Sequence, residues 1–186
     1  MILRYEAKLY SPKPADMSRV FIIQVHLEDD SFQIREPPQR NTGHSGGIFL
    51  ARDRFESKDL GRYLVPEDIS IGKTVQIMAH KFVLFNADEY TLRYMESNEN
   101  RWMASDVKLV LAKLSSKLET IKKLILTTPN IQTAELDYDG VFDLLVSAGV
   151  NLIKQEVLTI CRYIDPTRGG AVKLSKFLKA VVSFKN

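Results

Sequence analysis

The hydrophobic pattern in the middle of the chain predicts two strands and a helix. Residues 75–79 alternate between apolar and polar side chains, which is typical of a strand with one buried face. Residues 82–85 are all apolar and do not alternate with polar residues, so we expect the second strand to be buried on both faces. After Asn86 the apolar residues follow helical spacing, and Asp88 and Glu89 provide the negative charge that a helix N-terminus favours. The pattern predicts a hairpin followed by a helix that folds back over the sheet.

Upstream of this hairpin the chain shows a series of short strand patterns. The predicted strands span residues 2–10, 19–28, 32–35, 48–51 and 63–65. Residues 36–47 contain two prolines and three glycines and fit neither a helix nor a central strand, and residues 52–61 are expected to form a charged loop. Short strands followed by one helix indicate an α+β fold. They predict a partly closed antiparallel β-barrel capped by that helix, with a pleckstrin-homology-like order of elements.

Helical spacing dominates the second half of the sequence. Apolar residues between 107 and 125 predict an amphipathic helix of about five turns that ends before Pro129. Three further helices are expected around residues 141–149, 157–164 and 174–181. The predicted organisation is a β-domain over residues 1–98, a connecting amphipathic helix over 99–128 and an all-helical, EF-hand-like domain over 129–186.

Composition and charge exclude several classes of protein. The 186 residues are 45% hydrophobic and 26% charged, as in an ordinary globular protein, and no apolar run approaches the roughly 20 residues of a membrane span. The N-terminus lacks the pattern of a secretory signal. The single cysteine, Cys161, allows neither an internal disulfide nor a cysteine-based zinc site. We therefore expect a cytoplasmic protein that does not bind a membrane.

The net charge of +3 is small but unevenly distributed. After residue 153 the basic side chains outnumber two acidic ones, Glu156 and Asp165. The basic residues are Lys154, Arg162, Arg168, Lys173, Lys176, Lys179 and Lys185. They form either a solvated helical surface or a patch for an acidic partner, and the excess is too small to indicate nucleic acid.

Two glycine-containing segments bear a superficial likeness to phosphate sites. Residues 71–74, Ile-Gly-Lys-Thr, match the end of a P-loop, but Glu67 stands where its earlier glycine belongs and a strand follows instead of a helix. Residues 41–47 could present backbone N–H groups to an anion, although such loops are mostly conformational. The three histidines lie on separate predicted elements without ligand spacing. No metal site, general base or cofactor site is predicted.

Residues 165–176 have the frame of a twelve-residue calcium loop. Asp165 occupies position one and Gly170 position six, between two predicted helices. Calcium also requires further oxygen ligands, above all a bidentate carboxylate at position twelve. Position twelve is Lys176, and only Asp165 and Thr167 remain as side-chain ligands. The segment therefore has the length and the glycine position of a calcium loop but lacks the ligands that calcium needs.

An upstream segment, residues 129–140, would be the partner loop of such a pair. Pro129 stands at its first position, and Val141-Phe142-Asp143 follow the acidic residues Asp137 and Asp139 where further ligands would be needed. The two loops therefore predict a structural, degenerate EF-hand pair that is held by hydrophobic faces, and we do not expect it to bind calcium.

Several segments together resemble the DM-ten module followed by an EF-hand-like pair, as in the C-terminal part of the myoclonin family of EF-hand-containing axonemal ribbon proteins. The segments that carry the resemblance are 21–23, 36–43, 46–50, 71–72, 80–82 and 88–96. The most specific of them are Glu-Pro-Pro-Gln-Arg-Asn at 36–41 and Asp-Glu-Tyr-Thr-Leu-Arg-Tyr-Met-Glu at 88–96. The chain departs from the family at Ala79, where relatives tend to have glycine in a tight turn, and at the missing calcium ligands.

This resemblance implies a pleckstrin-homology-like barrel and a non-enzymatic role in the axoneme of cilia or flagella. It implies a microtubule inner protein, part of the cytoskeleton, that binds tubulin in the A-tubule lumen of doublet microtubules beside other inner proteins. Family members usually carry three such modules. The contact surface that we predict comprises Arg40, Asn41 and His44 in the long loop and Lys173, Lys176 and Lys179 near the C-terminus.

Three other functions remain as alternatives at this stage. A calcium-responsive regulator would act through the EF-hand pair, and Lys176 argues against it. A phosphoinositide- or anion-binding module rests on analogy with the barrel fold alone. An enzyme is the least favoured, because no nucleophile, base and orienting group can be assembled from the sequence.

Overall fold

The computed structural model describes residues 1–38 and 46–185 of the chain. The chain divides into two compact units, Met1–Ser97 and Asn98–Asn186. The predicted contact residues Arg40, Asn41 and His44 lie outside the described residues. Each unit is described separately.

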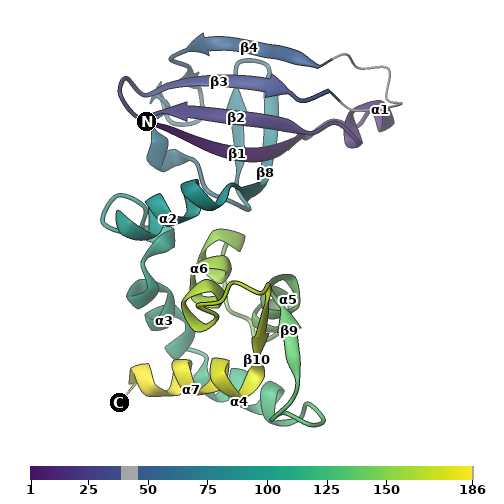
Figure 1. Ribbon diagram of the computed structural model, residues 1–186, viewed down its shortest axis with the longest axis vertical. Coiled ribbons are helices and arrows are strands. Elements are labelled where there is room, and N and C mark those ends of the chain that lie inside the picture. Colours follow the sequence, from purple (N-terminus) through teal and green to yellow (C-terminus); the bar gives the residue numbers. More distant parts are fainter. Residues whose placement is uncertain (39–45, 186) are drawn as a thin grey trace. The chain divides into compact units, whose positions relative to one another are not determined.

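The first unit is built on a six-stranded antiparallel sheet with the order β4-β3-β2-β1-β8-β7 (Figure 1). Its strands are β1 (Ile2–Leu9), β2 (Phe21–His26), β3 (Ser31–Glu36), β4 (Gly47–Asp53), β7 (Thr74–Ile77) and β8 (His80–Ala87). Shorter elements complete the unit: α1 (Pro14–Met17), the strand pair β5 (Glu56–Ser57) and β6 (Arg62–Tyr63), a 3₁₀ turn (Pro66–Asp68) and α2 (Glu89–Ser97). The antiparallel sheet followed by a helix confirms the α+β prediction, and the sheet curls as a half-barrel.

The concave face of the sheet carries the core of this unit. In β1, Leu3, Tyr5 and Ala7 are fully buried because alternate residues of a strand point to the same face. Helix α2 follows β8 in the chain and packs against this core. The Tyr5 hydroxyl lies 3.2 Å from the Met95 sulfur. The helix is therefore part of the packed interior.

Helix α2 begins at a well-defined N-terminus. The Asp88 side chain accepts a hydrogen bond from the Thr91 N–H at 2.8 Å, which caps the first turn. The buried Thr91 hydroxyl in turn accepts a hydrogen bond from the Arg4 N–H of β1 at 2.7 Å. The acidic start predicted from the sequence thus both caps the helix and places it against β1.

Strand β8 corrects the prediction of burial on both faces. Phe82 and Leu84 are buried, whereas Phe85 is 38% exposed. The Lys8 ammonium lies 5.6 Å from the centre of the Phe85 ring on the outer face. An antiparallel sheet with one covered face leaves its other face to solvent, and aromatic residues there are partly covered by long neighbouring side chains.

One arginine connects the start of β2 to the end of β3. Arg19 donates two hydrogen bonds to the Glu36 carboxylate, at 2.8 and 2.7 Å, and one to Asp16 at 3.1 Å. Its guanidinium carbon lies 5.0 Å from the centre of the Phe21 ring. Hydrogen bonding to Glu36 is the main reason that the pKa of Arg19 is raised. These contacts fix the end of β3, where the proline- and glycine-rich segment begins.

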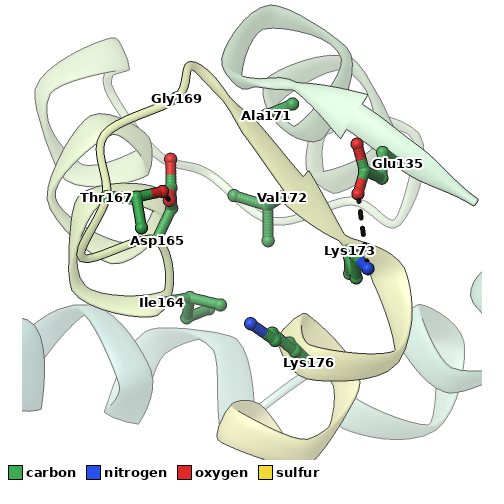
Figure 2. Close-up of a pocket in the computed structure, with 9 residues that line it drawn as sticks. All are labelled: Glu135, Ile164, Asp165, Thr167, Gly169, Ala171, Val172, Lys173 and Lys176. Carbon is green, nitrogen blue, oxygen red and sulfur yellow. Dashed lines mark hydrogen bonds and ion pairs between the residues drawn. The ribbon is translucent and has the colours of Figure 1, made fainter.

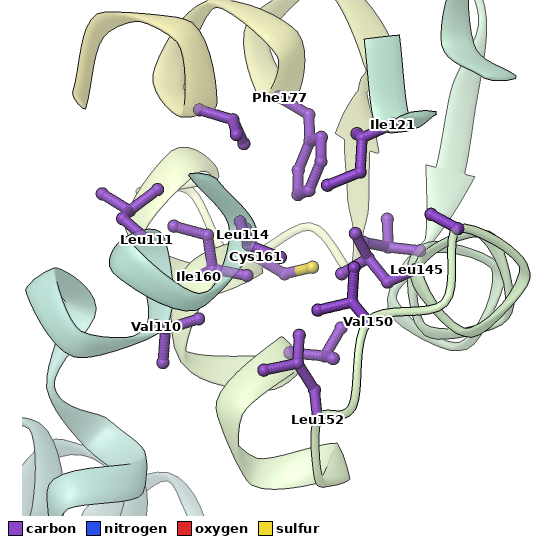
Figure 3. Close-up of a cluster of buried hydrophobic side chains, with 14 of the residues drawn as sticks. Val110, Leu111, Leu114, Ile121, Leu145, Val150, Leu152, Ile160, Cys161 and Phe177 are labelled. Carbon is purple, nitrogen blue, oxygen red and sulfur yellow. The ribbon is translucent and has the colours of Figure 1, made fainter. Parts of the chain in front are cut away.

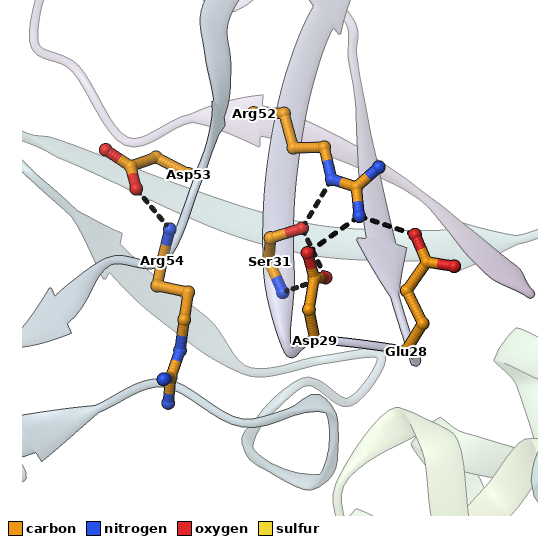
Figure 4. Close-up of polar contacts among 6 residues, drawn as sticks. All are labelled: Glu28, Asp29, Ser31, Arg52, Asp53 and Arg54. Atoms are coloured by element: carbon orange, nitrogen blue, oxygen red, sulfur yellow. Dashed lines mark hydrogen bonds and ion pairs between the residues drawn. The ribbon is translucent and has the colours of Figure 1, made fainter.

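A second arginine holds the opposite end of the same strands. Arg52 donates hydrogen bonds to Glu28 at 2.6 Å, to Asp29 at 2.8 Å and to the Ser31 hydroxyl at 2.7 Å (Figure 4). These contacts join β4 to the β2–β3 turn. The segment 52–61, predicted as a charged loop, therefore begins inside β4 and also contains β5. Charged residues on the solvent-exposed face of a strand cannot be distinguished from those of a loop by sequence alone, and for this reason the segment was predicted to be a loop.

The second unit contains five α-helices in its described part. They are α3 (Val107–Ser115), α4 (Leu118–Leu126), α5 (Tyr138–Ser147), α6 (Lys154–Ile164) and α7 (Leu174–Lys185), with a 3₁₀ turn at Met103–Ser105 and the short strands β9 (Glu135–Asp137) and β10 (Ala171–Lys173). Nowhere in the described residues is a helix both long and apolar enough to span a membrane.

The structure divides the single amphipathic helix expected over 99–128 into α3 and α4. The hydroxyls of Ser115 and Ser116 donate hydrogen bonds to carbonyls three residues earlier, and Lys117 leaves the helical conformation with φ −121° and ψ 19°. Serine competes with the backbone in this way at helix ends. The break lets Leu114 and Leu118 both enter one core. Apolar spacing did not reveal it because both helices use the same period.

A contiguous core joins all five helices of this unit (Figure 3). Val110 and Leu114 of α3 and Ile160, Cys161 and Phe177 of the later helices are fully buried. The 99–128 segment is therefore part of the helical core and does not act only as a connector. The Asp106 side chain starts α3 by accepting hydrogen bonds from two backbone N–H groups.

The β7–β8 turn settles the conformation at Ala79. Ile77 pairs with His80, so the turn consists of Met78 and Ala79. Met78 has a φ of +56°, and the left-handed conformation is thus taken by Met78 instead of Ala79. A side chain with a Cβ is disfavoured in this conformation.

We predict that Met78→Gly stabilises the chain, because glycine relieves the left-handed strain at an exposed position. The expected gain is about 0.5–1 kcal/mol in the free energy of unfolding, after allowing for the greater freedom of glycine in the unfolded chain. Ala79→Gly is the matched control and should be neutral or destabilising. Chemical denaturation of the three proteins measures both changes. A gain from Ala79→Gly with a loss from Met78→Gly would contradict this description of the turn.

Candidate functional site

The second unit contains two helix–loop–helix segments whose loops pair with each other. One segment joins α4 to α5 and the other joins α6 to α7. Strands β9 and β10 are antiparallel, with Leu136 opposite Val172 and Glu135 opposite Lys173. In twelve-residue frames that start at Pro129 and Asp165, Leu136 and Val172 are both the eighth residue. The predicted frames of the two loops are therefore consistent with the strand register.

The second loop surrounds a cavity of about 250 Å³ (Figure 2). Asp165 stands on one side and Lys176 extends into the region from α7. The lining residues are Glu135, Ile164, Asp165, Thr167, Gly169, Ala171, Val172, Lys173 and Lys176. Asp165, Thr167, Lys173 and Lys176, which belong to one predicted loop, all line this cavity.

Asp165 is already engaged by groups of the protein. Its carboxylate accepts hydrogen bonds from the Thr167 hydroxyl at 2.5 Å and from the Tyr138 hydroxyl at 3.1 Å. Backbone N–H groups of Gly169 and Gly170 also donate to it. Hydrogen bonding, first of all from Thr167, lowers the pKa of Asp165. The charge that would face a calcium ion is thus stabilised from within the protein.

The remaining positions of the loop supply the wrong chemistry for calcium. Calcium binds oxygen ligands at positions one, three, five, seven, nine and twelve. Gly169 at position five has no side chain, and Lys173 and Lys176 bring positive charges to positions nine and twelve. Lys173 lies 3.8 Å from the Glu135 carboxylate in an ion pair. Within residues 1–38 and 46–185, no group of three or more acidic, histidine or cysteine side chains could hold a metal.

The first loop uses its acidic residue for another purpose. The Asp137 side chain accepts a hydrogen bond from the Gly140 N–H at 2.7 Å and thereby caps α5. Glu135 is turned toward Lys173. Asp137 therefore supports the start of α5 and Glu135 supports the loop pairing, while Asp139 forms an ion pair with Lys154 of α6 at 2.8 Å.

Tyr138 is the functional residue that sequence analysis missed. It belongs to the first loop, yet its hydroxyl donates to Asp165 of the second. Burial, followed by this hydrogen bond, raises the pKa of Tyr138 to about 12, so the hydroxyl keeps its proton at neutral pH. A tyrosine beside acidic residues gives no sequence signal for a partner that lies 27 residues away.

The other candidate residues have contacts that give them a role in the fold. Gly72, in the P-loop-like segment, has a φ of +89° and donates its N–H to the Leu84 carbonyl, so this segment is a turn that enters β7. His80 packs its ring edge against Phe49, with the ring centres 4.9 Å apart. Cys161 is buried, and burial raises its pKa to about 12. Its protonated thiol is a poor nucleophile.

Comparison with known proteins identifies the first unit. Residues 1–91 match the DM10 domain. The first unit is thus a DM10 domain, and the relatives that the chain matches are EF-hand domain-containing proteins. EF-hand domain-containing family member C2 of Mus musculus is 37% identical to this chain over 173 residues, which cover 87% of the chain and 23% of that relative. The family predicted from the sequence segments is thus confirmed.

A second group of relatives supports the same assignment. EF-hand domain-containing protein 1 of Mus musculus is 31% identical over 193 residues, covering 96% of this chain and 30% of the relative. The Homo sapiens protein of the same name is 41% identical over 101 residues, covering 52% of this chain and 16% of the relative. The DM10 chain therefore spans about a quarter of the length of the curated relatives it matches.

We predict that restoring two ligands creates calcium binding in the second loop. Gly169→Asp with Lys176→Glu supplies a carboxylate at position five and the bidentate carboxylate at position twelve. Thermal unfolding in about 10 mM calcium should shift upward by a few degrees relative to chelator, as expected for a site with roughly millimolar affinity. The unchanged chain should show no shift.

Gly169→Asp with Lys176→Gln is the matched control, because it removes the ammonium group without adding the position-twelve carboxylate. It should respond to calcium much less than the variant with glutamate. An equal calcium shift in the unchanged chain would contradict the conclusion that the native loop has lost its site.

Proposed function

We propose that this DM10 chain is a non-enzymatic structural protein of ciliary or flagellar axonemes. In this proposal it is a microtubule inner protein that binds tubulin in the A-tubule lumen of doublet microtubules and contacts neighbouring inner proteins. Membership of the DM10 and EF-hand family supports it. The observation that carries its calcium-independent, structural part is a pair of loops held together by β9–β10 pairing while Lys176 stands at the position of the essential calcium carboxylate.

The proposal includes a structural assignment for each unit. The first unit is a pleckstrin-homology-like half-barrel in which α2 closes the end of the curled sheet; the Tyr5–Met95 contact supports this. The second unit is a degenerate EF-hand pair. The register between the eighth residues of the two loops, and the start of α5 and α7 at the tenth, support this second assignment.

A structural role fits the way in which the second unit is stabilised. A calcium sensor changes shape because ion binding rearranges its helices. Here the Tyr138–Asp165 hydrogen bond and the Glu135–Lys173 ion pair connect the loops through protein groups alone. A calcium-responsive regulator remains the alternative, and the test below includes it.

The proposed contact surface has two parts. Arg40, Asn41 and His44 come from the proline- and glycine-rich segment, whose base is held by Arg19 and Glu36. Lys173, Lys176 and Lys179 come from β10 and α7. The basic character of the second set suits an acidic protein wall.

We expect the purified chain to bind when it is present during tubulin polymerisation, and to bind equally with calcium and with chelator. Co-sedimentation with increasing chain should saturate. Chain added after polymerisation should bind less, because the closed wall restricts access to the lumen.

Alanine replacement of Arg40, Asn41 and His44 should weaken binding without changing thermal unfolding. Calcium-dependent binding would support the regulator, and absence of binding under all conditions would contradict tubulin as partner.

A further inference from the structure

The second unit has a groove that the proposed calcium-free scaffold does not explain. It is lined by the C-terminal end of α6, by α7 and by Leu111 of α3, and it has a volume of about 610 Å³. Its residues are Leu111, Tyr163, Ile164, Lys176, Lys179, Ala180, Ser183 and Phe184. This volume is in the range of pockets that bind compact ligands or several side chains of a partner.

Helix α7 presents two different faces, and one of them borders this groove. Phe177 and Val181 face the core and are fully buried. Lys176, Ala180 and Phe184 follow at intervals of four residues and therefore lie along another side of the helix. The small side chain of Ala180 leaves space between the larger two. The groove thus arises from a second stripe of side chains that the internal core does not use.

Two large aromatic side chains at this groove are exposed. Tyr163 is 60% exposed and Phe184 is 40% exposed. Single exposed apolar residues are ordinary, but exposed aromatic residues gathered around one groove are typical of an interaction surface. Leu111 and Ile164 extend the apolar surface inward. The groove therefore offers contact area to apolar side chains of a partner.

The charge around the groove has one sign. Lys176 and Lys179 line it, and no carboxylate does so. Three other lysines of this unit have acidic partners: Lys113 pairs with Glu156, Lys154 with Asp139 and Lys173 with Glu135. Among the described residues, Lys122 and Lys123 of α4 are unpaired like the groove lysines, and they line a surface that also contains Glu119. Within the described part of the chain, neither groove lysine lies within ion-pair distance of an acidic group. Two ammonium groups at the edge of an apolar groove favour acidic residues that flank apolar anchors.

We propose that this groove binds an acidic amphipathic helix of a partner protein, with apolar anchors between Tyr163 and Phe184 and carboxylates facing Lys176 and Lys179. A groove between helices receives a helix through anchors spaced three or four residues apart. This inference rests on the proposed function in one respect. Lys176 and Lys179 belong to the contact surface proposed above, and the inference states which kind of partner they would bind.

The test uses the full chain and a fluorescein-labelled synthetic peptide as the probe. The peptide carries leucine at helical spacing on one face and glutamate on the others, and its partner peptide carries lysine in place of every glutamate. Fluorescence anisotropy should show saturable binding of the acidic peptide alone, and added salt should weaken it because exposed charges are screened. Equal binding of both peptides, or of neither, would overturn the proposal.

Chain variants locate the binding site. Lys176→Glu with Lys179→Glu should weaken binding of the acidic peptide by about tenfold or more, since two attractive contacts become repulsive. Tyr163→Ala and Phe184→Ala should weaken it as well, and both positions are exposed enough to leave folding intact. Lys122→Glu with Lys123→Glu makes the same charge change on α4 and should have a much smaller effect. Equal effects of the two lysine pairs would show that overall charge governs binding and overturn the proposed site.

Co-sedimentation of the same variants with tubulin distinguishes this inference from the proposed function. Loss of peptide binding in the groove variants supports the groove, whatever their tubulin binding. Tubulin binding without peptide binding by the unchanged chain contradicts the groove and leaves the axonemal role in place. Peptide binding without tubulin binding contradicts that role and leaves the groove in place.

Discussion

The pairing of two short strands, with Leu136 opposite Val172, is the constraint on which the second unit depends. It brings together loops that are separated by two helices in the sequence, and Val172 is buried in the common core. The Tyr138–Asp165 hydrogen bond crosses between the same loops. In a calcium-binding pair the ion would contribute to this organisation. Here apolar packing and hydrogen bonds between protein groups perform that role.

The same principle operates in the DM10 unit, where polar contacts fix the ends of a sheet whose core is apolar. Arg19 joins β2 to β3 at one end, and Arg52 joins β4 to the β2–β3 turn at the other. The Arg19 pair is largely enclosed, whereas the Arg52 cluster is more exposed and more strongly screened. Removing one partner of the Arg19 pair should therefore destabilise the unit more than removing one partner of the Arg52 cluster, because it leaves a charge enclosed without its counter-charge. Both units thus hold their loops through internal contacts.

Much of this organisation was predictable because it follows from local pattern. Alternation placed β1, β2, β3 and the β7–β8 hairpin, and Asp88 indicated the start of α2. The twelve-residue frame of the second loop also followed from spacing, since it is a property of one continuous segment, and the loss of calcium binding at Lys176 stays a prediction. Family segments added an assignment that residue chemistry alone does not provide.

What the sequence did not reveal depends on contacts between distant residues. The solvent exposure of Phe85 follows from a sheet with one covered face, and the break between α3 and α4 from serine hydroxyls and a shared core. Tyr138 acquires its role only when the loops meet. The groove beside α7 requires α3 and α6 to be in place. Periodicity describes a single element and contains no information about such neighbours.

Hydrogen exchange at the β9 and β10 amides tests whether the loops are joined without calcium. We expect residues 135–137 and 171–173 to be protected to the same extent with calcium and with chelator, and to lose protection together with the buried amides of α6. The register and the cross-loop hydrogen bond would then be properties of the metal-free chain. Protection that appears only when calcium is added would show instead that the second loop still depends on the ion.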